Sequence, residues 1–311
     1  MKILVTGTAG FLGSNLASKL LERDCKVVGV DNLVTGNLRN IAHLQSERNF
    51  TFYQEDVIQF SENLESGFDQ IYHLASPASP PKYMKYSYET MMVNTIATDR
   101  LCKYALLNDS RILFSSTSEI YGDPLVHPQT EEYWGNVNTL GIRSVYDESK
   151  RFGETIISHH KREKNLNAVI VRIFNTYGPK MDPNDGRVVT NFIRQILEGK
   201  PVTIYGDGLQ TRSFCYVDDL IEGLILAMNG KEFGPINLGN PVEFTLIELL
   251  QAIDSILRLE PEIIFQEIPE DDPKMRKPDI SRAKRMLGWT PRVDLIDGLA
   301  PTIEWVKSQL E

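Results

Sequence analysis

A glycine-rich segment near the start of the chain limits what the chain can fold into. Residues 2–6 form a mostly apolar run, as in a buried parallel strand, and Gly7-Thr-Ala-Gly10-Phe-Leu-Gly13 follows directly. Leucines then recur at helical spacing through residues 12–21. Glycines let a backbone approach a ligand closely, and a helix N-terminus offers free N–H groups to phosphate oxygens. A strand, a glycine loop and a helix in this order indicate a Rossmann-type dinucleotide site.

The residue that ends the second expected strand indicates which dinucleotide binds. That strand covers residues 26–30 and is followed by Asp31. A carboxylate there can accept hydrogen bonds from an adenosine ribose and would repel a 2′-phosphate, so NAD is expected rather than NADP. The spacing Gly-x-x-Gly-x-x-Gly differs from the commonest dinucleotide fingerprint, but its place between a strand and a helix favours the same interpretation. Asp56, after a strand at 50–54, could bond the adenine amino group.

The order of the expected elements predicts the fold class. Further buried strands are expected at residues 70–74, 111–115 and 168–174, with helices between them. This alternation predicts an α/β fold, a Rossmann-type doubly wound parallel sheet with a smaller C-terminal α/β substrate lobe. We assign residues 1–178 plus about 214–240 to the NAD-binding domain, and about 179–213 and 241–311 to the lobe that binds the substrate.

Local signals place several helix boundaries. A helix is expected over residues 88–107, whereas the proline-rich segment 76–81 is expected to be a loop. Asp218 is the expected N-cap of one helix, and Thr245 with Glu248 forms the expected capping box of another.

Two groups of polar residues carry the candidate chemistry. One buried strand is followed by Thr117, Ser118 and Glu119, and ligands of open α/β sheets bind beyond the carboxyl ends of strands. Tyr146 and Lys150 lie four positions apart, so a helix places them on one face. A tyrosine with an ordinary pKa of about 10 is a poor base, and a nearby ammonium stabilises its phenolate. The pair suits proton transfer from a hydroxyl that loses a hydride, although the same spacing also occurs on solvated helix faces.

Together these features are similar to the extended short-chain dehydrogenase/reductase superfamily that acts on nucleotide sugars. Within it, the chain closely resembles the decarboxylases of UDP-glucuronate. The motifs that carry this resemblance are Ser76-Pro-Ala-Ser-Pro, Thr117-Ser-Glu-Ile-Tyr-Gly-Asp-Pro, His127-Pro-Gln, Tyr133-Trp-Gly-Asn-Val-Asn and Tyr146-Asp-Glu-Ser-Lys-Arg. The related sugar 4,6-dehydratases usually carry an aspartate, the acid of water elimination, where this chain has Ser118. That difference argues against dehydration.

The resemblance implies decarboxylation of UDP-glucuronate to UDP-xylose through a 4-keto intermediate, with one NAD accepting and returning the hydride. Residue patterns and resemblance together give three sets of expected site residues. The expected catalytic residues are Tyr146, Lys150, Thr117, Ser118, Glu119 and Arg276. The expected cofactor contacts are Gly7, Gly10, Phe11, Leu12, Gly13, Asp31, Asn32, Asp56, Val57, Leu74, Ala75, Tyr146, Lys150 and Tyr177, the last placed near the nicotinamide by resemblance. The expected contacts to the UDP-sugar are Arg143, Asn175, Arg187, Asn191, Tyr205, Arg212 and Arg276.

Charge and composition argue against several partners. A net charge of −9 is unlike that of a general nucleic-acid binder, and the apolar runs are too short to span a bilayer, so neither nucleic acid nor a membrane is expected as a partner. Cys25, Cys102 and Cys215 are widely spaced and odd in number, which is typical of reduced thiols in a cytoplasmic protein. No metal site is expected. The resemblance implies a homodimer, formed through the helices at 88–107 and 146–164.

Three other functions remain open at this point. A 4-epimerase or a 4,6-dehydratase on the same scaffold would share the first oxidation, because fold does not determine function. A non-catalytic NAD-binding regulator is a third reading, but it would have no need of Thr117, Tyr146 and Lys150 together. The mass of the product distinguishes them, since decarboxylation releases carbon dioxide, dehydration releases water and epimerisation releases nothing.

Overall fold

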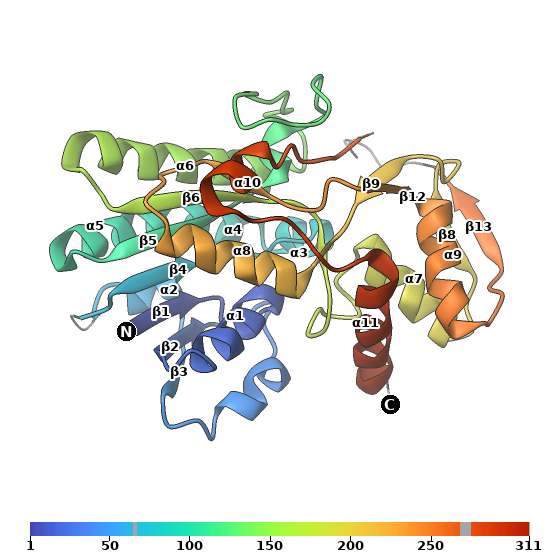
Figure 1. The fold of residues 1–311 in the computed structure, drawn as a ribbon, viewed down its shortest axis with the longest axis horizontal. Helices are drawn as coiled ribbons and strands as arrows, with labels where there is room; N and C mark the ends of the chain where they lie inside the picture. Colours follow the sequence, from blue (N-terminus) through green and yellow to red (C-terminus); the bar gives the residue numbers. More distant parts are fainter. Residues whose placement is uncertain (65–66, 268–274, 311) are drawn as a thin grey trace.

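A seven-stranded parallel sheet forms the centre of the molecule. The structure is a computed structural model that describes residues 1–64, 67–267 and 275–310. The strand order is β11-β6-β5-β4-β1-β2-β3. Figure 1 labels the six strands from β6 to β3 in this order. The strands are β1 (Lys2–Thr6), β2 (Lys26–Asp31), β3 (Phe50–Gln54), β4 (Gln70–His73), β5 (Arg111–Thr117), β6 (Ala168–Ile173) and β11 (Ile236–Leu238). The order reverses direction between β1 and β4, which is the switch point of a doubly wound sheet. The predicted fold class is confirmed.

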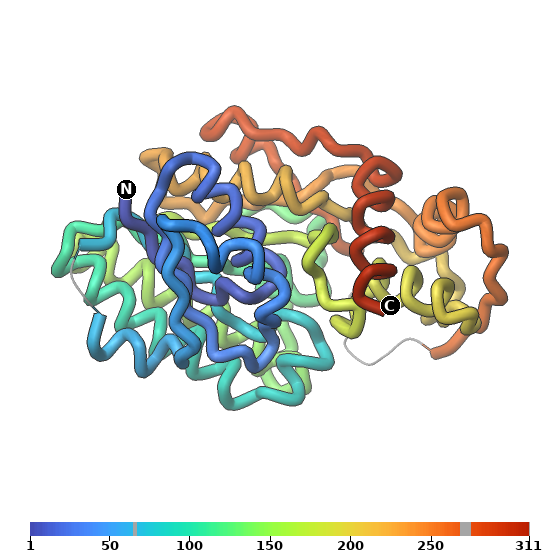
Figure 2. Tube along the Cα trace, turned by 90° about the horizontal axis from the view of Figure 1, so that it is seen from below, coloured from blue at the N-terminus to red at the C-terminus, as the bar shows by residue number. Residues whose placement is uncertain are grey.

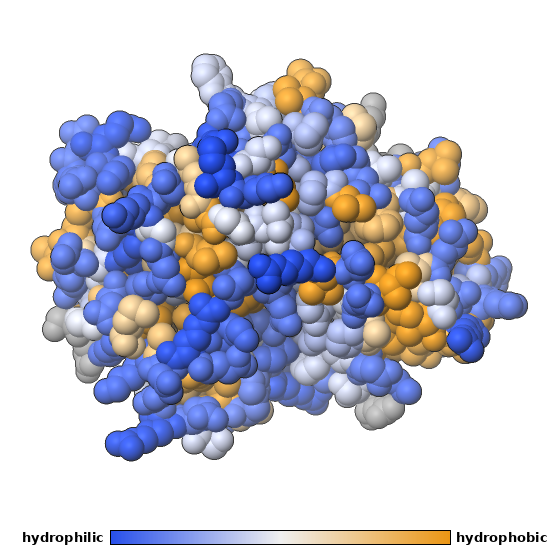
Figure 3. Space-filling view, in the orientation of Figure 1, coloured by the Kyte–Doolittle hydropathy of each residue, from blue (hydrophilic) through white to orange (hydrophobic). Residues whose placement is uncertain are grey.

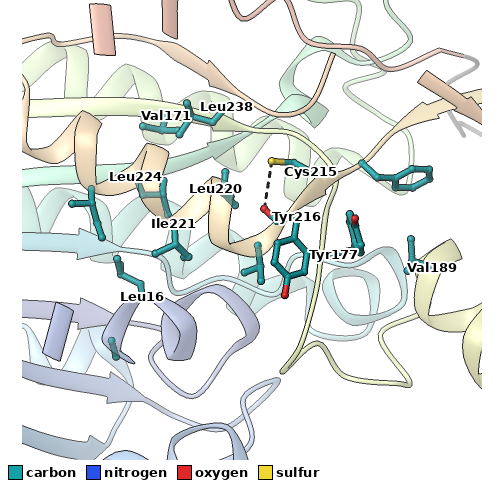
Figure 4. Packing of buried hydrophobic residues seen from close by; sticks show 14 of the residues in the cluster. Leu16, Val171, Tyr177, Val189, Cys215, Tyr216, Leu220, Ile221, Leu224 and Leu238 are labelled. Carbon is teal, nitrogen blue, oxygen red and sulfur yellow. Dashed lines mark hydrogen bonds between the residues drawn. The ribbon is translucent and has the colours of Figure 1, made fainter. Parts of the chain in front are cut away.

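Helices cover both faces of this sheet because the strands are apolar on both sides. On one face, α1 (Phe11–Leu21) packs against α8 (Val217–Asn229). Figure 4 shows side chains from both helices meeting residues of the sheet in one hydrophobic cluster. Ile3 and Val5 of β1 enter this cluster, whereas Leu4 between them enters the cluster on the opposite face.

The opposite face is covered by α5 (Thr98–Asn108) and α6 (Ser144–Lys164), which pack against each other. The helix expected over residues 88–107 is present, but it is not a single regular α-helix. This segment consists of α4 (Ser87–Met92), a π-helical turn (Val93–Ala97) and α5 in succession. The carbonyl oxygen of Val93 in the π turn lies 3.3 Å from Nε2 of His73, at the end of β4.

The remaining elements gather beside one end of the sheet. Figures 1 and 2 both show α11 between the sheet and the outer helix and strands of this part. Its helices are α7 (Val188–Leu197), α9 (Leu246–Leu257) and α11 (Leu295–Leu310). Its strand pairs are β8 (Val202–Tyr205) with β13 (Ile263–Gln266), and β9 (Thr211–Ser213) with β12 (Glu243–Thr245). The division of the chain into two domains at the expected boundaries stays a prediction.

Shorter elements connect these parts, and they test the expected helix boundaries. They are 3-10 helices at Leu38–Leu44 and Ser118–Tyr121, α2 (Val57–Phe60), α3 (Pro80–Lys85), β7 (Thr176–Tyr177), β10 (Cys215–Tyr216) and α10 (Ser281–Leu287). The capping box of Thr245 and Glu248 is confirmed. The N-cap expected at Asp218 is wrong, because the N-cap of α8 is Tyr216, two residues earlier, and Asp218 lies in the first turn of the helix. The loop expected over residues 76–81 ends early, since α3 starts at Pro80 and a proline needs no N–H in a first helical turn.

Candidate active site

A cavity of about 1050 Å³ lies at the carboxyl ends of the central strands. Its lining comes from the glycine loop, from the ends of β4, β5 and β6, from α6 and from the C-terminal part of the chain. Every expected site residue except Tyr177 lines it. The structure therefore brings together residues that are spread from Gly7 to Arg276, and their individual roles stay predictions.

The glycine loop leaves no room for side chains. Gly7 has a φ of +72°, in the left-handed region that favours glycine, and a Cβ there would lie 2.9 Å from backbone atoms of Ala75. A Cβ at Gly13 would overlap the carbonyl oxygen of Gly7. The loop and the first turn of α1 thus form a concave backbone surface that fits the diphosphate of a dinucleotide.

Asp31 lies beside this surface at the end of β2. Its carboxylate accepts hydrogen bonds from the backbone N–H groups of Leu33 at 2.8 Å and Ala9 at 3.0 Å. Burial raises the pKa of Asp31, and these two N–H groups partly oppose that effect. The carboxylate is thereby fixed where a ribose diol would reach it, so the residues present fit the adenosine half of NAD.

Tyr146 and Lys150 lie side by side in the cavity wall, as their spacing predicts. The Lys150 Nζ donates a hydrogen bond to the carbonyl oxygen of Ser115 at 2.7 Å and lies 5.8 Å from the centre of the Tyr146 ring. Burial lowers the pKa of Lys150 to about 7. The expectation that Tyr146 has a lowered pKa is not met in this structure, because burial raises it and a hydrogen bond with the Thr117 side chain only partly offsets the rise.

Glu119 is held between two arginines. Its Oε1 accepts a hydrogen bond from Nη1 of Arg276 at 2.7 Å, and its Oε2 accepts one from Nη2 of Arg143 at 2.6 Å. Burial alone would raise the pKa of Glu119, but Arg276 and Arg143 outweigh it and lower the pKa to about 2. Nη1 of Arg276 also donates a hydrogen bond to the hydroxyl of Ser118, at 3.1 Å. Three of the expected catalytic side chains, Ser118, Glu119 and Arg276, therefore form one charged group with little exposure to solvent.

Two residues that sequence reasoning missed lie against this group. The ring of Tyr83 stacks on that of Tyr146, with centroids 4.9 Å apart and planes within 4°. The Tyr83 hydroxyl is buried and has no hydrogen-bond partner in the part of the chain that the structure describes. Asp147 is also buried, and burial followed by repulsion from Glu119 raises its pKa to about 8. Asp147 could have been found because it lies four positions after Arg143 on the same helix face. Tyr83 follows a proline-rich loop, and that pattern does not reveal where its ring points.

The expected substrate contacts line the part of the cavity nearest the C-terminal lobe. Arg187 precedes α7 and pairs with Asp185 at 2.9 Å. Asn191, in the first turn of the same helix, donates to the carbonyl oxygen of Gly186 at 2.9 Å. Arg212 and Arg276 form a β-bridge, so their backbones lie side by side. Asn175 and Tyr205 also line the cavity. This positively charged end suits a diphosphate.

Tyr177 is the one expected cofactor contact that does not line the cavity. Its hydroxyl donates to the carbonyl oxygen of Leu295 at 3.1 Å, and its ring packs against Tyr216, with centroids 5.7 Å apart. Gly298 of α11 leaves the space that this ring fills, since a Cβ there would overlap the Tyr177 hydroxyl. Packing against α11 places the Tyr177 ring in the core, and its expected place near the nicotinamide stays a prediction.

Within the residues that the structure describes, no helix is long and apolar enough to cross a bilayer. The same residues hold no group of three or more histidine, cysteine, aspartate or glutamate side chains arranged to bind a metal ion.

The parallel sheet, the glycine loop with Asp31 and the buried Tyr146–Lys150 pair define a dinucleotide-dependent enzyme of the Rossmann class. A model of the NAD dependent epimerase/dehydratase family matches residues 3–239. The chain belongs to this family, whose cofactor is the one expected from Asp31.

Individual relatives are similar over the whole chain. UDP-glucuronic acid decarboxylase 1 of Xenopus tropicalis is 47% identical over 310 residues, which cover 100% of this chain and 73% of the relative. UDP-glucuronic acid decarboxylase 6 of Arabidopsis thaliana is 49% identical over 300 residues, covering 96% and 87%. A solved UDP-glucuronic acid 4-epimerase of Bacillus cereus, in complex with UDP-glucuronic acid and NAD, has a TM-score of 0.90 and 31% identity, with 100% of both chains covered. A UDP-glucose 4-epimerase of Thermotoga maritima with UDP-glucose has a TM-score of 0.90 and 30% identity, with the same coverage.

Replacing the carboxylate of Asp31 tests the cofactor site. We expect Asp31→Ala to weaken NAD binding by about 10- to 100-fold, because a hydrogen bond to a charged group contributes about 1.5–3 kcal/mol. Calorimetric titration with NAD measures the change, and circular dichroism checks folding, since Asp31 also holds two backbone N–H groups. Glu47→Ala, at an exposed position, is the matched control. Equal affinity in Asp31→Ala and the parent protein would contradict the assignment.

Proposed function

We propose that this protein is an NAD-dependent decarboxylase that converts UDP-glucuronate to UDP-xylose. The observation that carries the proposal is Arg276, which is 2% exposed and lies in the same cavity as Tyr146. Arg276 bonds Ser118 and Glu119, and among the described residues its Nε has no hydrogen-bond partner. A guanidinium in the cavity wall suits a substrate that carries a carboxylate. Relatives that are 47–49% identical over nearly the whole chain bear the name UDP-glucuronic acid decarboxylase.

The first step is oxidation at carbon 4 of the sugar. Tyr146 takes the proton of the 4-hydroxyl, with Thr117 hydrogen-bonded to the same phenolic oxygen. Lys150 stabilises the phenolate through its charge. NAD, when bound, supplies the acceptor for the hydride from carbon 4 and returns that hydride at the end of the cycle. The glycine loop and Asp31 would hold it.

Oxidation makes the second step possible. The 4-ketone is β to the carboxylate, so the bond between carbon 5 and carbon 6 can break with release of carbon dioxide, and its electron pair passes into an enolate between carbons 4 and 5. Protonation at carbon 5 restores the ketone, and Tyr146 then returns its proton to the oxygen on carbon 4. Glu119 positions the ring, while Arg276 and Arg143 bind substrate charge and assist the delivery of the proton. Ser118 has a hydroxyl where elimination of water would need an acid.

A 4-epimerase is the second candidate, because solved 4-epimerases have TM-scores of 0.90 with this chain. The product mass tests the proposal against it. We expect the purified protein, given UDP-glucuronate and NAD, to form a product lighter by one carbon dioxide, with no net NADH. Mass spectrometry measures the product, and absorbance measures NADH. A product of unchanged mass would overturn the proposal that the protein is a decarboxylase. If the protein binds NAD but converts none of the sugar nucleotides tested, the non-catalytic regulator is favoured instead.

Removing the phenolic oxygen of Tyr146 tests the base. We expect Tyr146→Phe to lower kcat by about 10²- to 10⁴-fold, because proton transfer by a positioned side chain contributes that much. NAD affinity should stay nearly unchanged, since the ring and Lys150 remain. Tyr53→Phe is the matched control, at an exposed position outside the cavity. Turnover equal to that of the parent protein would exclude Tyr146 as the base.

We also propose that the protein is a cytoplasmic homodimer that pairs through α4, α5 and α6. Hydrophilic residues cover most of the face drawn in Figure 3, with hydrophobic residues in smaller patches. Large apolar side chains on α4–α6 and the turn between them are exposed, namely Tyr88, Ile96, Leu107 and Phe152. Pairing would remove them from water.

The assembly has its own test. We expect Leu107→Glu combined with Phe152→Glu to convert the dimer to a monomer, since each change would bury a charge in the contact. Light scattering after gel filtration measures the mass, and Leu259→Glu, exposed in the other part of the molecule, is the control. A parent protein that is monomeric in solution would refute the dimer.

A further inference from the structure

A partly buried carboxylate lies one helical turn beyond the Lys150 ammonium. Glu154 follows Lys150 by four positions on α6, just as Lys150 follows Tyr146, so the three side chains lie along one face of the helix. The helix packs closely on β5 at this level, because a Cβ at Gly153 would overlap the ring of Phe114. Glu154 therefore belongs to the wall behind the proposed base.

Both oxygens of Glu154 are held in place. Its Oε1 accepts hydrogen bonds from Oγ of Ser116 at 2.6 Å and from Nε of Arg172 at 2.9 Å, and its Oε2 accepts one from Nη2 of Arg172 at 2.8 Å. Arg172 is fixed in turn, because its Nη1 donates to the hydroxyl of Tyr121 and the carbonyl oxygen of Glu131, both at 3.0 Å. The Glu154 and Arg172 side chains are only 14% and 10% exposed, so the charge of this bidentate pair is weakly screened.

Strand β5 connects this ion pair to Lys150. The carbonyl oxygen of Ser115 accepts the hydrogen bond from the Lys150 Nζ, and the next residue, Ser116, bonds Glu154. Among the ion pairs formed by described residues, none within 4.0 Å includes Lys150. Glu154 thus acts on the ammonium from one turn away, and through Ser116 it also holds the strand that Lys150 contacts.

The other charged or titratable groups around Lys150 do not provide a counter-charge. Burial lowers the pKa of Lys150, and Glu154 is the group that opposes this effect. His73 of β4 is neutral, because burial and then Lys150 lower its pKa to about 3. Burial raises the pKa of Tyr146, and Arg172 of β6 is a cation that bonds Glu154.

We propose that Glu154, fixed by Arg172 and Ser116, is a positioning residue of the reaction: it keeps Lys150 protonated in a desolvated site and holds the strand carbonyl that Lys150 binds. The inference rests on the proposed function, in which the Lys150 ammonium stabilises the Tyr146 phenolate. An ammonium that loses a nearby anion gives up its proton at a lower pH. Removing the charge of Glu154 must therefore move the alkaline limb of the activity profile to lower pH.

The experiment compares Glu154→Gln with the parent protein and with Glu163→Gln, which removes a carboxylate from the exposed end of the same helix. Two quantities are measured against pH. The first is the ¹³Cε chemical shift of Lys150 in lysine-labelled protein, assigned with Lys150→Arg, and the second is kcat/KM. We expect Glu154→Gln to lower the pKa of Lys150 by about 1 unit and to move the alkaline limb of kcat/KM to lower pH by the same amount. The reason is that two charges about one helical turn apart interact with little screening in this site. Glu163→Gln should change neither.

A purely structural role for Glu154 predicts a different result. Glu154→Gln would then lower the melting temperature and kcat at every pH, with the Lys150 titration unchanged, and that result would overturn the proposal. If the single variant does not fold, Glu154→Gln combined with Arg172→Gln removes both charges and leaves no unpaired buried cation. Its Lys150 pKa should lie below that of the parent protein, and an equal value would also overturn the proposal. The NMR titration needs no substrate, so failure of the decarboxylase assignment would appear in the product mass instead.

Discussion

The close packing of α6 on β5 is the constraint on which the proposed chemistry depends. Gly153 lets the helix approach Phe114, and that approach brings Lys150 within 2.7 Å of the carbonyl oxygen of Ser115. Two residues further along β5, Thr117 reaches the hydroxyl of Tyr146. Because β5 is parallel to its neighbours, its carboxyl end opens at the same edge of the sheet as the glycine loop after β1. One helix–strand contact thus positions the proposed base relative to the cofactor site.

Burial of charge at this edge is tolerated only where a counter-charge is fixed by geometry. Glu119 and Asp147 show the contrast, since the first is a half-buried and the second a buried carboxyl group of the same cluster. Two guanidinium groups lower the pKa of Glu119 to about 2 despite burial, whereas burial and the charge of Glu119 raise the pKa of Asp147 to about 8. The pKa values of the two carboxyl groups are therefore shifted in opposite directions, as in enzymes whose paired carboxyl groups have separate tasks.

Sequence periodicity could predict whatever depends on local geometry. The four-residue spacing of Tyr146 and Lys150 predicts their shared helix face, and the glycine spacing after a strand predicts the cradle at Gly7 and Gly13. Contacts between distant segments could not be predicted in this way. Tyr177 belongs to a motif beside the cavity, yet Gly298 receives its ring, and no local pattern links positions so far apart. Arg276 reaches Glu119 from 157 positions away, so only the resemblance to known enzymes pointed to it.

The scaffold does not decide between decarboxylation and epimerisation, because solved 4-epimerases share it at a TM-score of 0.90 and about 30% identity. Both reactions begin with removal of a proton and a hydride at carbon 4, and we assign acceptance of the proton to Tyr146 and of the hydride to NAD. They diverge once the 4-ketone exists. An epimerase must then rotate the ketone and keep its carboxylate, whereas a decarboxylase must hold the ketone still while the carboxylate leaves. The Ser118–Arg276–Glu119 group is held in place by Arg143 and the Gly122 carbonyl oxygen. In the function we propose, this group contacts the substrate carboxylate, and its fixed position favours holding the ketone over rotating it. On that proposal, the outcome of the reaction depends on a few polar and charged side chains that meet beyond the end of β5.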